Sequence, residues 1–465
     1  MAKKICSHCV TEPYLNQCIL EEGKMNKCSF CKNEGRTFDL EKITRMVKST
    51  LKRHFERTAS EPTDRENLIQ NLLKEEWERK GEKLQNIIED QFRIRYEAAQ
   101  EIADDLIESE NHLNDYDSGE NFDDEPHYIE KEITDGQWSS EWDQFTNILK
   151  TESRFFNQKL ESFLASIFEN LNSIITSNSQ SVLTKIGPNK EIKSLYRARV
   201  FQSRDKLLHA LEKPEIHLGP PPSEYASDGR MNARGISVFY GATDKETAIA
   251  EVRPPTNSTV AVAKFNLVRT LQLLDLRNLE KTTERISIFS PQYQEKMEKA
   301  KFLSKLSSML TRPIMPDDEV FEYLPTQAIA DYLSSQTNID IDGIIFPSVQ
   351  GEGTNIVLFK KSSKVNSYKL PTGTETEVRD YEDHEYGGWS NYSIIDWVPK
   401  TINTKKRITP KSKIKGLENG ALEIDMESIE IHDIGKVKYP TISHRVNRKR
   451  IEDPYIETGS QRLRP

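Results

Sequence analysis

The sequence predicts a multidomain protein with a small cysteine-rich ribbon, a helical region, an α+β domain and a polar C-terminal extension. Three observations carry this prediction. All five cysteines lie within the first 31 residues, apolar positions recur at helical spacing over residues 41–185, and short β-branched runs alternate with helical segments over residues 190–368. The length of 465 residues agrees with several folding units of ~100–200 residues each.

The first predicted module, residues 1–40, is defined by its cysteines. Two Cys-x2-Cys pairs stand 18 residues apart, which is typical of zinc sites where two knuckles each present two thiolates to a tetrahedral ion. A segment this short and this poor in apolar residues needs a metal to fold. We therefore expect a structural zinc ribbon without chemistry at the metal, because four protein ligands leave no open position. The expected ligands are Cys6, Cys9, Cys28 and Cys31.

Other interpretations of this module stay open. The four thiols could be free, with a coincidental spacing, and His8 could replace one ligand. Cys18 is expected to be a spare thiol. Residues 1–60 hold 12 Lys or Arg and 7 Asp or Glu, which permits contact with nucleic acid but suits a scaffold or partner surface equally well.

The second predicted module, residues 41–185, reads as helical with one interruption. The acidic stretch 108–135 contains Gly and Pro and is expected to be a solvated loop. Apolar residues from Phe145 to Ile175 share one helical face and predict one long amphipathic helix. Shorter helical patterns are formed by Ile43, Met46, Val47 and Leu51, by Leu68, Ile69, Leu72 and Leu73, and by Leu84, Ile87 and Ile88.

The third predicted module, residues 190–368, has the pattern of a compact α+β domain. Helices are expected over 244–252, around 302–309 and from about 323, and Thr243 or Asp244 is a suitable N-cap for the first of them. Strands are expected at 236–240, 259–265, 271–276, 342–346 and 355–359.

The last predicted module, residues 369–465, is polar. An acidic run, 375–385, precedes a basic segment, 400–415, and alternation over 421–439 is compatible with a small β-hairpin. The net charge of −9 argues against a general nucleic-acid coat protein. We expect a cytoplasmic protein without membrane association, because neither an apolar span of ~20 residues nor a signal-peptide pattern is found.

The densest polar signal lies within residues 219–253. Arg230, Tyr240 and Glu251 are spaced 10 and 11 residues apart, so a strand–loop–helix unit could bring their side chains into one cleft. From residue types alone, a surface arginine, a half-buried aromatic and an exposed carboxylate are the more ordinary interpretations. The segment 351–356, GEGTNI, lacks the third glycine and the following helix of a dinucleotide fingerprint.

The segment GRMNARGISVFYGATDKETAIAEVRP (229–254) resembles the RES domain. LYRAR (195–199), YLPTQAIADYL (323–333) and DGIIFPS (342–348) fit the same family in order, so the resemblance covers about 190–360. It implies a fold similar to that of ADP-ribosyltransferases. It also implies consumption of NAD+, an activity of toxins in bacterial toxin–antitoxin systems, and hence an inhibitory or regulatory protein partner.

The region before this domain resembles, more weakly, the HEPN-related segment that precedes some longer RES proteins. HEPN-type ribonucleases need an Arg four to six residues before a His. None of His54, His112 and His127 has such an Arg, so we expect no ribonuclease activity from this region. The polar extension or the acidic loop could restrain the enzyme by covering its cleft.

The resemblance also implies roles for individual residues. Glu251 would stabilise the oxocarbenium-like centre, and Arg230 would bind the pyrophosphate. Tyr240 would stack on nicotinamide and orient it through its hydroxyl. Ser348 would donate to a phosphate or ribose oxygen, and Arg197 is a second phosphate ligand. The family often has Trp after its turn Arg, whereas this chain has Met231, which removes one stacking surface.

Three functions remain in competition after these steps. The first is an NAD+ glycohydrolase or phosphorylase, in which water or phosphate accepts the ADP-ribosyl group. The second is a transferase that places ADP-ribose on a protein or nucleic acid, because acceptor choice depends on the mouth of the cleft. The third is a non-enzymatic adapter that binds a partner or nucleic acid through its zinc module, helices and basic segment.

Overall fold

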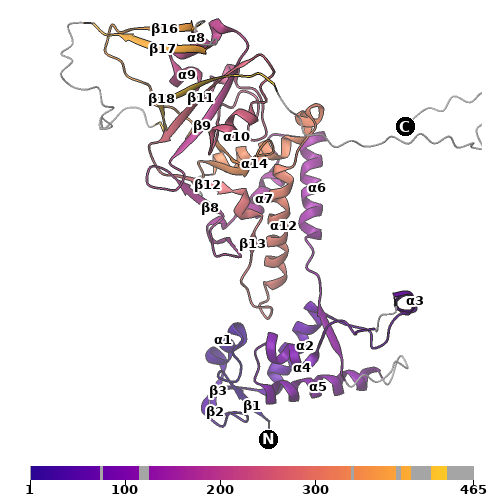
Figure 1. Ribbon diagram of the computed structural model, residues 1–465. Coiled ribbons are helices and arrows are strands. Elements are labelled where there is room, and N and C mark those ends of the chain that lie inside the picture. The colour runs from indigo at the N-terminus through magenta and orange to yellow at the C-terminus, as the bar shows by residue number, and fades with distance from the viewer. Residues whose placement is uncertain are drawn as a thin grey trace, which may run out of the picture.

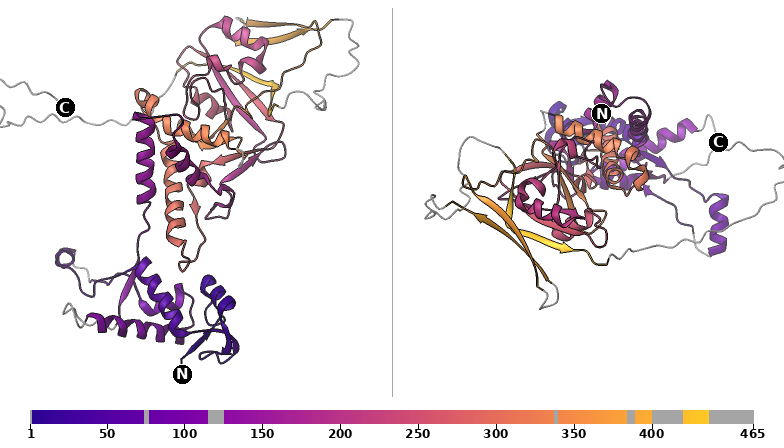
Figure 2. Two further views of the ribbon diagram at one scale, coloured as in Figure 1. Left: turned by 180° about the vertical axis from the view of Figure 1, so that it is seen from behind. Right: turned by 90° about the horizontal axis from the view of Figure 1, so that it is seen from above.

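The chain forms two lobes, which Figures 1 and 2 show from three directions. The computed structural model describes residues 2–73, 77–114, 125–336, 340–383, 389–399 and 420–436. We call residues 2–130 the N lobe and residues 136–436 the sheet lobe. Within these described ranges, no helix combines the length and the apolar character that a bilayer span requires.

The N lobe begins with a small antiparallel sheet in the order β1-β3-β2, and a helix lies between the two cysteine pairs. These elements are β1 (Lys4–Cys6), α1 (Pro13–Glu22), β2 (Lys24–Lys27) and β3 (Glu34–Asp39). A helical part with the sheet β4-β6-β5 follows. It comprises α2 (Leu40–His54), β4 (Phe55–Arg57), α3 (Asp64–Leu73), β5 (Glu82–Lys83), α4 (Leu84–Asn86), the π-helical turn Ile87–Gln91, α5 (Tyr96–Asn114) and β6 (His127–Glu130).

One apolar core unites the cysteine-rich sheet with the helices. Ile5 and Leu15 from the first part are fully buried together with Ile43 of α2 and Ile102 of α5. Helix α1 starts where Pro13 occupies the first turn and the Glu12 carboxylate accepts a hydrogen bond from Leu15 N at 2.8 Å. The small sheet and the helices therefore share one apolar core and form a single folded unit.

Helix α3 is present, as the spacing of its apolar residues predicts, but three of its leucines are exposed. Leu68, Leu72 and Leu73 keep 64%, 75% and 61% of their surface exposed. In α2, by contrast, Ile43 and Val47 are fully buried, as their spacing predicts. Helical periodicity shows that a face is apolar, but it does not show that another element covers that face.

The prediction of a single long helix from Phe145 to Ile175 is wrong, because the chain forms two helices there. Helix α6 (Gly136–Thr151) ends before a bend, and α7 (Gln158–Phe168) starts where the Asn157 side chain caps Lys159 N at 3.0 Å. Phe156 adopts a left-handed conformation with φ of 58° in the bend. The apolar positions keep their helical spacing across this break, which hides it in the sequence.

The sheet lobe is built on one eight-stranded sheet in the order β18-β11-β9-β10-β15-β14-β12-β8. Every pair is antiparallel except β12–β14. All five predicted strands are present, although the first begins three residues late because Ile236 still belongs to a turn. The strands are β8 (Leu183–Ile186), β9 (Ser194–Phe201), β10 (Phe239–Ala242), β11 (Thr259–Leu267), β12 (Leu271–Asp275), β14 (Gly343–Pro347), β15 (Thr354–Leu358) and β18 (Leu422–Asp433).

Helices and two small strand pairs surround this sheet. The pairs are β7 (Ile175–Thr176) with β13 (Thr282–Thr283), and β16 (Glu375–Asp383) with β17 (Trp389–Trp397). The helices after α7 are α8 (Arg204–Glu212), α9 (Pro214–His217), α10 (Lys245–Glu251), α11 (Leu276–Leu279), α12 (Tyr293–Thr311), α13 (Glu319–Glu322) and α14 (Leu324–Ser335), with 3-10 turns at Leu171–Ser173, Ser223–Tyr225 and Pro316–Asp318.

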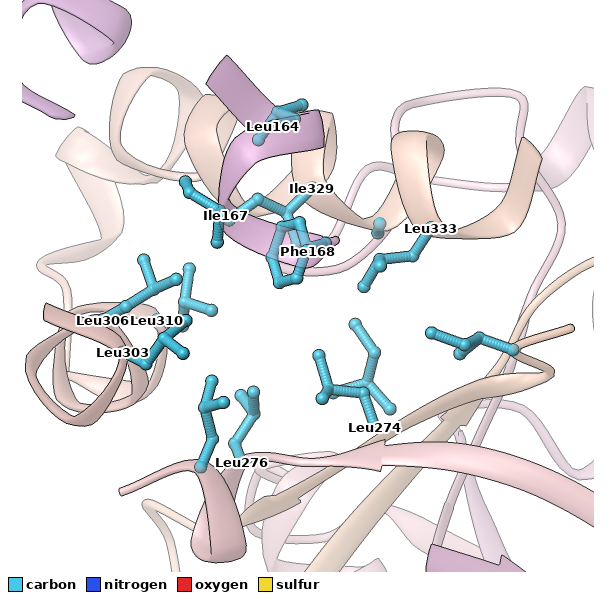
Figure 3. Close-up of a cluster of buried hydrophobic side chains, with 14 of the residues drawn as sticks. Leu164, Ile167, Phe168, Leu274, Leu276, Leu303, Leu306, Leu310, Ile329 and Leu333 are labelled. Carbon is cyan, nitrogen blue, oxygen red and sulfur yellow. The ribbon is translucent and has the colours of Figure 1, made fainter. Parts of the chain in front are cut away.

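The largest core lies between one face of the sheet and helices α6, α7, α12 and α14. Figure 3 shows side chains of α7, α12 and α14 converging on Leu274 of β12 and Leu276 of α11. Phe302 of α12 is fully buried and stacks on Trp138 of α6, with ring centroids 5.6 Å apart. Helices α6 and α7 therefore belong to the packing of the sheet lobe.

The described part of the run 421–439, which ends at residue 436, forms no hairpin of its own. Residues Leu422–Asp433 make the single strand β18, which pairs with β11 from Leu267↔Leu422 to Thr259↔Asp433. The hydrogen-bonding edge of β11 is covered in this way, whereas alternation alone cannot tell which strand a segment will pair with. The basic segment 400–415 lies outside the described residues, as do residues 115–124 and everything after residue 436. The expectation of a loop over the whole stretch 108–135 is wrong, because α5 extends to Asn114 and His127–Glu130 form β6.

The lobes meet at the start of α12. Phe289, which precedes α12, is 5% exposed and packs in the N-lobe core against Phe92, with ring centroids 4.8 Å apart. The Tyr293 hydroxyl donates to the Glu130 carboxylate at 3.0 Å. A segment of the sheet lobe therefore completes the core of the N lobe.

Candidate functional site

A pocket of about 530 Å³ opens beside β9, β10 and α10, within the size range of small-molecule sites. Four of the residues singled out in the sequence line it: Arg197, Arg230, Tyr240 and Glu251. Ser348 lies at its rim, bonded to Glu251. The structure thus brings together all five side chains that the sequence proposed for one cleft. No residue after Asn355 lines the pocket in the part of the chain that the structure describes.

Local structure explains the position of Glu251. Strand β10 ends at Ala242, and the Asp244 carboxylate caps the next helix by accepting from Thr247 N at 2.8 Å. Helix α10 is only seven residues long, and Glu251 is its last residue. The helix therefore carries this carboxylate from the end of the strand to the pocket.

One oxygen of the Glu251 carboxylate is fixed and the other is open. Its Oε1 accepts from Ser348 Oγ at 2.6 Å and from Asn355 Nδ2 at 2.7 Å. Its Oε2 accepts no hydrogen bond from any described residue. The side chain is otherwise exposed, so a ligand in the pocket can reach this second oxygen.

The Ser348 hydroxyl is fully engaged. Its oxygen accepts from the backbone N–H groups of Gln350 and Gly351, each at 3.1 Å, and its single hydrogen points to Glu251. A hydroxyl has one hydrogen to donate. Donation to a phosphate or ribose oxygen, as the resemblance implies, would require Ser348 to release Glu251.

The Tyr240 hydroxyl is engaged in the same manner. It donates to Asn232 Oδ1 at 2.9 Å and accepts from Met231 N at 3.0 Å, and burial raises the pKa of Tyr240 above its ordinary value. This hydroxyl therefore fixes the turn that carries Arg230. The ring of Tyr240, which also lines the pocket, remains for contact with a ligand.

Arg230 is held from three sides. Its Nη1 donates to the carbonyl of Leu310, the last buried position of α12, at 2.9 Å, and its guanidinium lies 5.2 Å from the centre of the Tyr323 ring. Helix α14 fixes the main chain, because the Thr326 hydroxyl donates to the Arg230 carbonyl. The turn is therefore set by the helices behind it.

Arg197 extends from β9 into the same pocket. Its Nη1 donates to the Tyr240 carbonyl at 2.6 Å, and its guanidinium lies 5.2 Å from the centre of the Phe239 ring. Burial lowers the pKa of Arg197 to about 10, so it is a cation at neutral pH. Its Nε is buried and finds no acceptor among the described residues, which leaves a donor unsatisfied beside the pocket.

Several residues of the site were missed by sequence reasoning. Asn355 was predicted as the first residue of the strand 355–359 with no role in the site, and it is the buried second residue of β15. Asn232 is 3% exposed and its amide bonds three backbone carbonyls of the loop 227–236. Tyr323 and Arg253 also line the pocket, and Arg253 has a left-handed backbone with φ of 43°. A polar residue at the head of an apolar run was the one available signal for Asn355.

The four cysteines of the two Cys-x2-Cys pairs come together in the N lobe. Their sulfur atoms all lie within 4.8 Å of one another, with Cys6–Cys31 at 3.5 Å and Cys9–Cys28 at 3.8 Å. Sulfur atoms around one tetrahedral zinc at 2.3 Å would be about 3.8 Å apart. The cluster therefore fits a zinc ion, and Cys18 lies outside it.

Comparison with known families gives two matches. Residues 194–380 match the RES domain, and residues 21–163 match HEPN/RES N-terminal domain 1. No curated protein and no solved structure matches the chain. The first match begins at the first residue of β9 and includes every residue that lines the pocket, whereas β8 and β18 of the same sheet lie outside it.

Proposed function

Because the chain joins a RES domain to a HEPN/RES N-terminal domain 1, we propose that it consumes NAD+ by cleaving the nicotinamide–ribose bond. The RES match supports an NAD+-related activity of a toxin-like or defence effector. We further propose that the sheet lobe shares the fold of ADP-ribosyltransferases and that the cysteine cluster holds one structural zinc.

The observation that carries this proposal is the Glu251 carboxylate, with one oxygen anchored and the other open to the pocket. In the reaction, the bond between ribose C1′ and the nicotinamide nitrogen breaks, and its electron pair leaves with nicotinamide. Positive charge then develops on the ribose. Glu251 Oε2 would bind a ribose hydroxyl and stabilise that charge.

The rest of the pocket suits the remaining parts of a dinucleotide. Arg230 and Arg197 would bind the pyrophosphate, for which a guanidinium offers two parallel N–H donors. The rings of Tyr240 and Tyr323 offer flat faces for nicotinamide. Ser348 would act through Glu251, because its hydrogen is already committed to that carboxylate.

The acceptor in this proposal is water or phosphate. Its oxygen bonds to C1′ and loses a proton, which gives free ADP-ribose or its phosphate. Transfer to a protein or nucleic acid is the second candidate, because the pocket is open to solvent beside Glu251. NAD+ labelled in its adenine half separates the two: label recovered only in small products excludes the transferase.

The test is nicotinamide release from NAD+ by the purified full chain. We expect Glu251→Gln to lower the rate by about 100-fold or more, because it removes the charge and keeps the shape. Glu246→Gln is the matched control, since Glu246 is exposed on the same helix and does not line the pocket. Release that is undiminished in Glu251→Gln would overturn the proposal, and binding of nucleic acid without turnover would favour an adapter.

A further inference from the structure

An amide side chain is buried where an apolar one would be expected. Asn355 is the second residue of β15, and the three residues that follow it, Ile356, Val357 and Leu358, are fully buried. The residue itself is 5% exposed and pairs with Ala242 of β10 on one side and with Phe346 of β14 on the other. Burial of an amide is unfavourable unless its groups are bonded.

The amide has one specific partner. Among the described residues, the only side-chain hydrogen bond of Asn355 runs from Nδ2 to Glu251 Oε1, at 2.7 Å. The bond joins a rigid central strand to the end of a short helix. The register of β15 sets the position of Asn355 independently of Glu251. Its side-chain amide therefore donates from a fixed place in the sheet.

Two donors of different origin therefore meet on one oxygen. Ser348 comes from the loop after β14 and Asn355 from β15, and both bond Oε1. The Ser348 hydroxyl is itself oriented by the N–H groups of Gln350 and Gly351. Glu251 alone could rotate freely at the exposed end of its helix, whereas two fixed donors hold the carboxylate plane.

We infer that Asn355 is a positioning residue that, with Ser348, presents Glu251 Oε2 to the ribose. This inference rests on the proposed function. A neutral amide suits the role, because it stabilises the ionised carboxylate without neutralising its charge. A misplacement of about 1 Å at a reacting group can lower a rate by about 100-fold.

The test separates positioning from stability. Asn355→Leu keeps a side chain of related shape and removes the amide, so a purely structural role predicts a change in thermal unfolding with unchanged turnover. We expect kcat for nicotinamide release to fall about 10–100-fold, with an unchanged KM and an unfolding temperature at least equal to that of the wild type. Asn355→Ala is the second variant in case leucine does not fit.

Two comparisons complete the experiment. Asn266→Ala removes an asparagine of β11 outside the pocket and should leave kcat unchanged. Ser348→Ala combined with Asn355→Leu should lower kcat further than either change alone, because both donors act on one oxygen. If Glu251→Gln abolishes turnover but Asn355→Leu and Asn355→Ala leave it at the wild-type rate, this inference is overturned and the proposed function stands. Absence of nicotinamide release from the wild type overturns the proposed function and this inference with it.

Discussion

The loop that carries Ser348 packs on α10 so closely that only a glycine fits at position 353. A Cβ at Gly353 would lie 2.5 Å from Asp244 Oδ2, 2.9 Å from Thr247 Cβ and closer still to Thr247 Oγ1. Ordinary contacts of this kind begin at 3.4 Å. Since Thr247 is 4% exposed and Asp244 caps the helix, neither can move away easily, and the loop must retreat by about 1 Å.

Such a retreat separates Ser348 from Glu251. Lengthening their 2.6 Å hydrogen bond by about 1 Å takes it beyond the range in which a hydrogen bond exists. We therefore expect Gly353→Ala to lower kcat for nicotinamide release by about 10–100-fold. The free energy of unfolding should fall by only about 1–3 kcal/mol, as for other overpacked sites.

The same loop offers a matched control. A Cβ at Gly351 would meet only Thr247 Oγ1, at 4.0 Å, so Gly351→Ala should keep wild-type turnover. The effects of Gly353→Ala and Ser348→Ala should be less than additive, because both break the same contact. Wild-type turnover in Gly353→Ala, or an equal loss in Gly351→Ala, would refute the reasoning.

Three other predictions concern the metal, a buried charge and pH. Cys28→Ser should remove the zinc measured by mass spectrometry, whereas Cys18→Ser should keep it; retained zinc in Cys28→Ser would contradict the cluster. Arg197→Met should raise the KM for NAD+ about tenfold, while the free energy of unfolding stays equal or rises by about 1 kcal/mol. The reason is that the charge of Arg197 is unfavourably buried, as its pKa of about 10 indicates. A lower free energy of unfolding with an unchanged KM would count against this. Burial lowers the pKa of His54 below 6.5, so as the pH falls the unfolded chain binds a proton before the folded chain does, and the free energy of unfolding decreases below pH 6.5. His54→Phe should reduce this decrease between about pH 7.5 and 5.5. Parallel curves of unfolding free energy against pH for the two proteins would disprove it.

Much of the fold could be predicted because local patterns decide it. The apolar run 259–265 becomes β11, and Asp244 caps α10 as its position before the helix indicates. The helical N-terminal region, the sheet-rich domain and the RES resemblance are confirmed by the two family matches. Arg230 and Glu251 were singled out by that resemblance, because residue types alone favoured ordinary surface roles.

What could not be predicted depends on contacts between distant segments. Asn355 reaches Glu251 only because β15 pairs with β10 in one particular register. The strand β18 needed the open edge of β11, which no local pattern reveals. The exposure of α3 and the break before α7 could not be predicted for the same reason, since helical periodicity does not show which element packs against a face.

The contact between the lobes has a consequence for how this protein can be divided. The stretch that matches the N-terminal family includes α6, whose Trp142 packs in the core of the sheet lobe, while Phe289 from the RES stretch fills the core of the N lobe. The end of the N-terminal family match therefore does not coincide with the boundary between the two lobes. A single cut of the backbone between Glu130 and Lys131 leaves α6 with the sheet lobe, so the contacts of Phe289 and Tyr293 with the N lobe are what would then hold the two halves together.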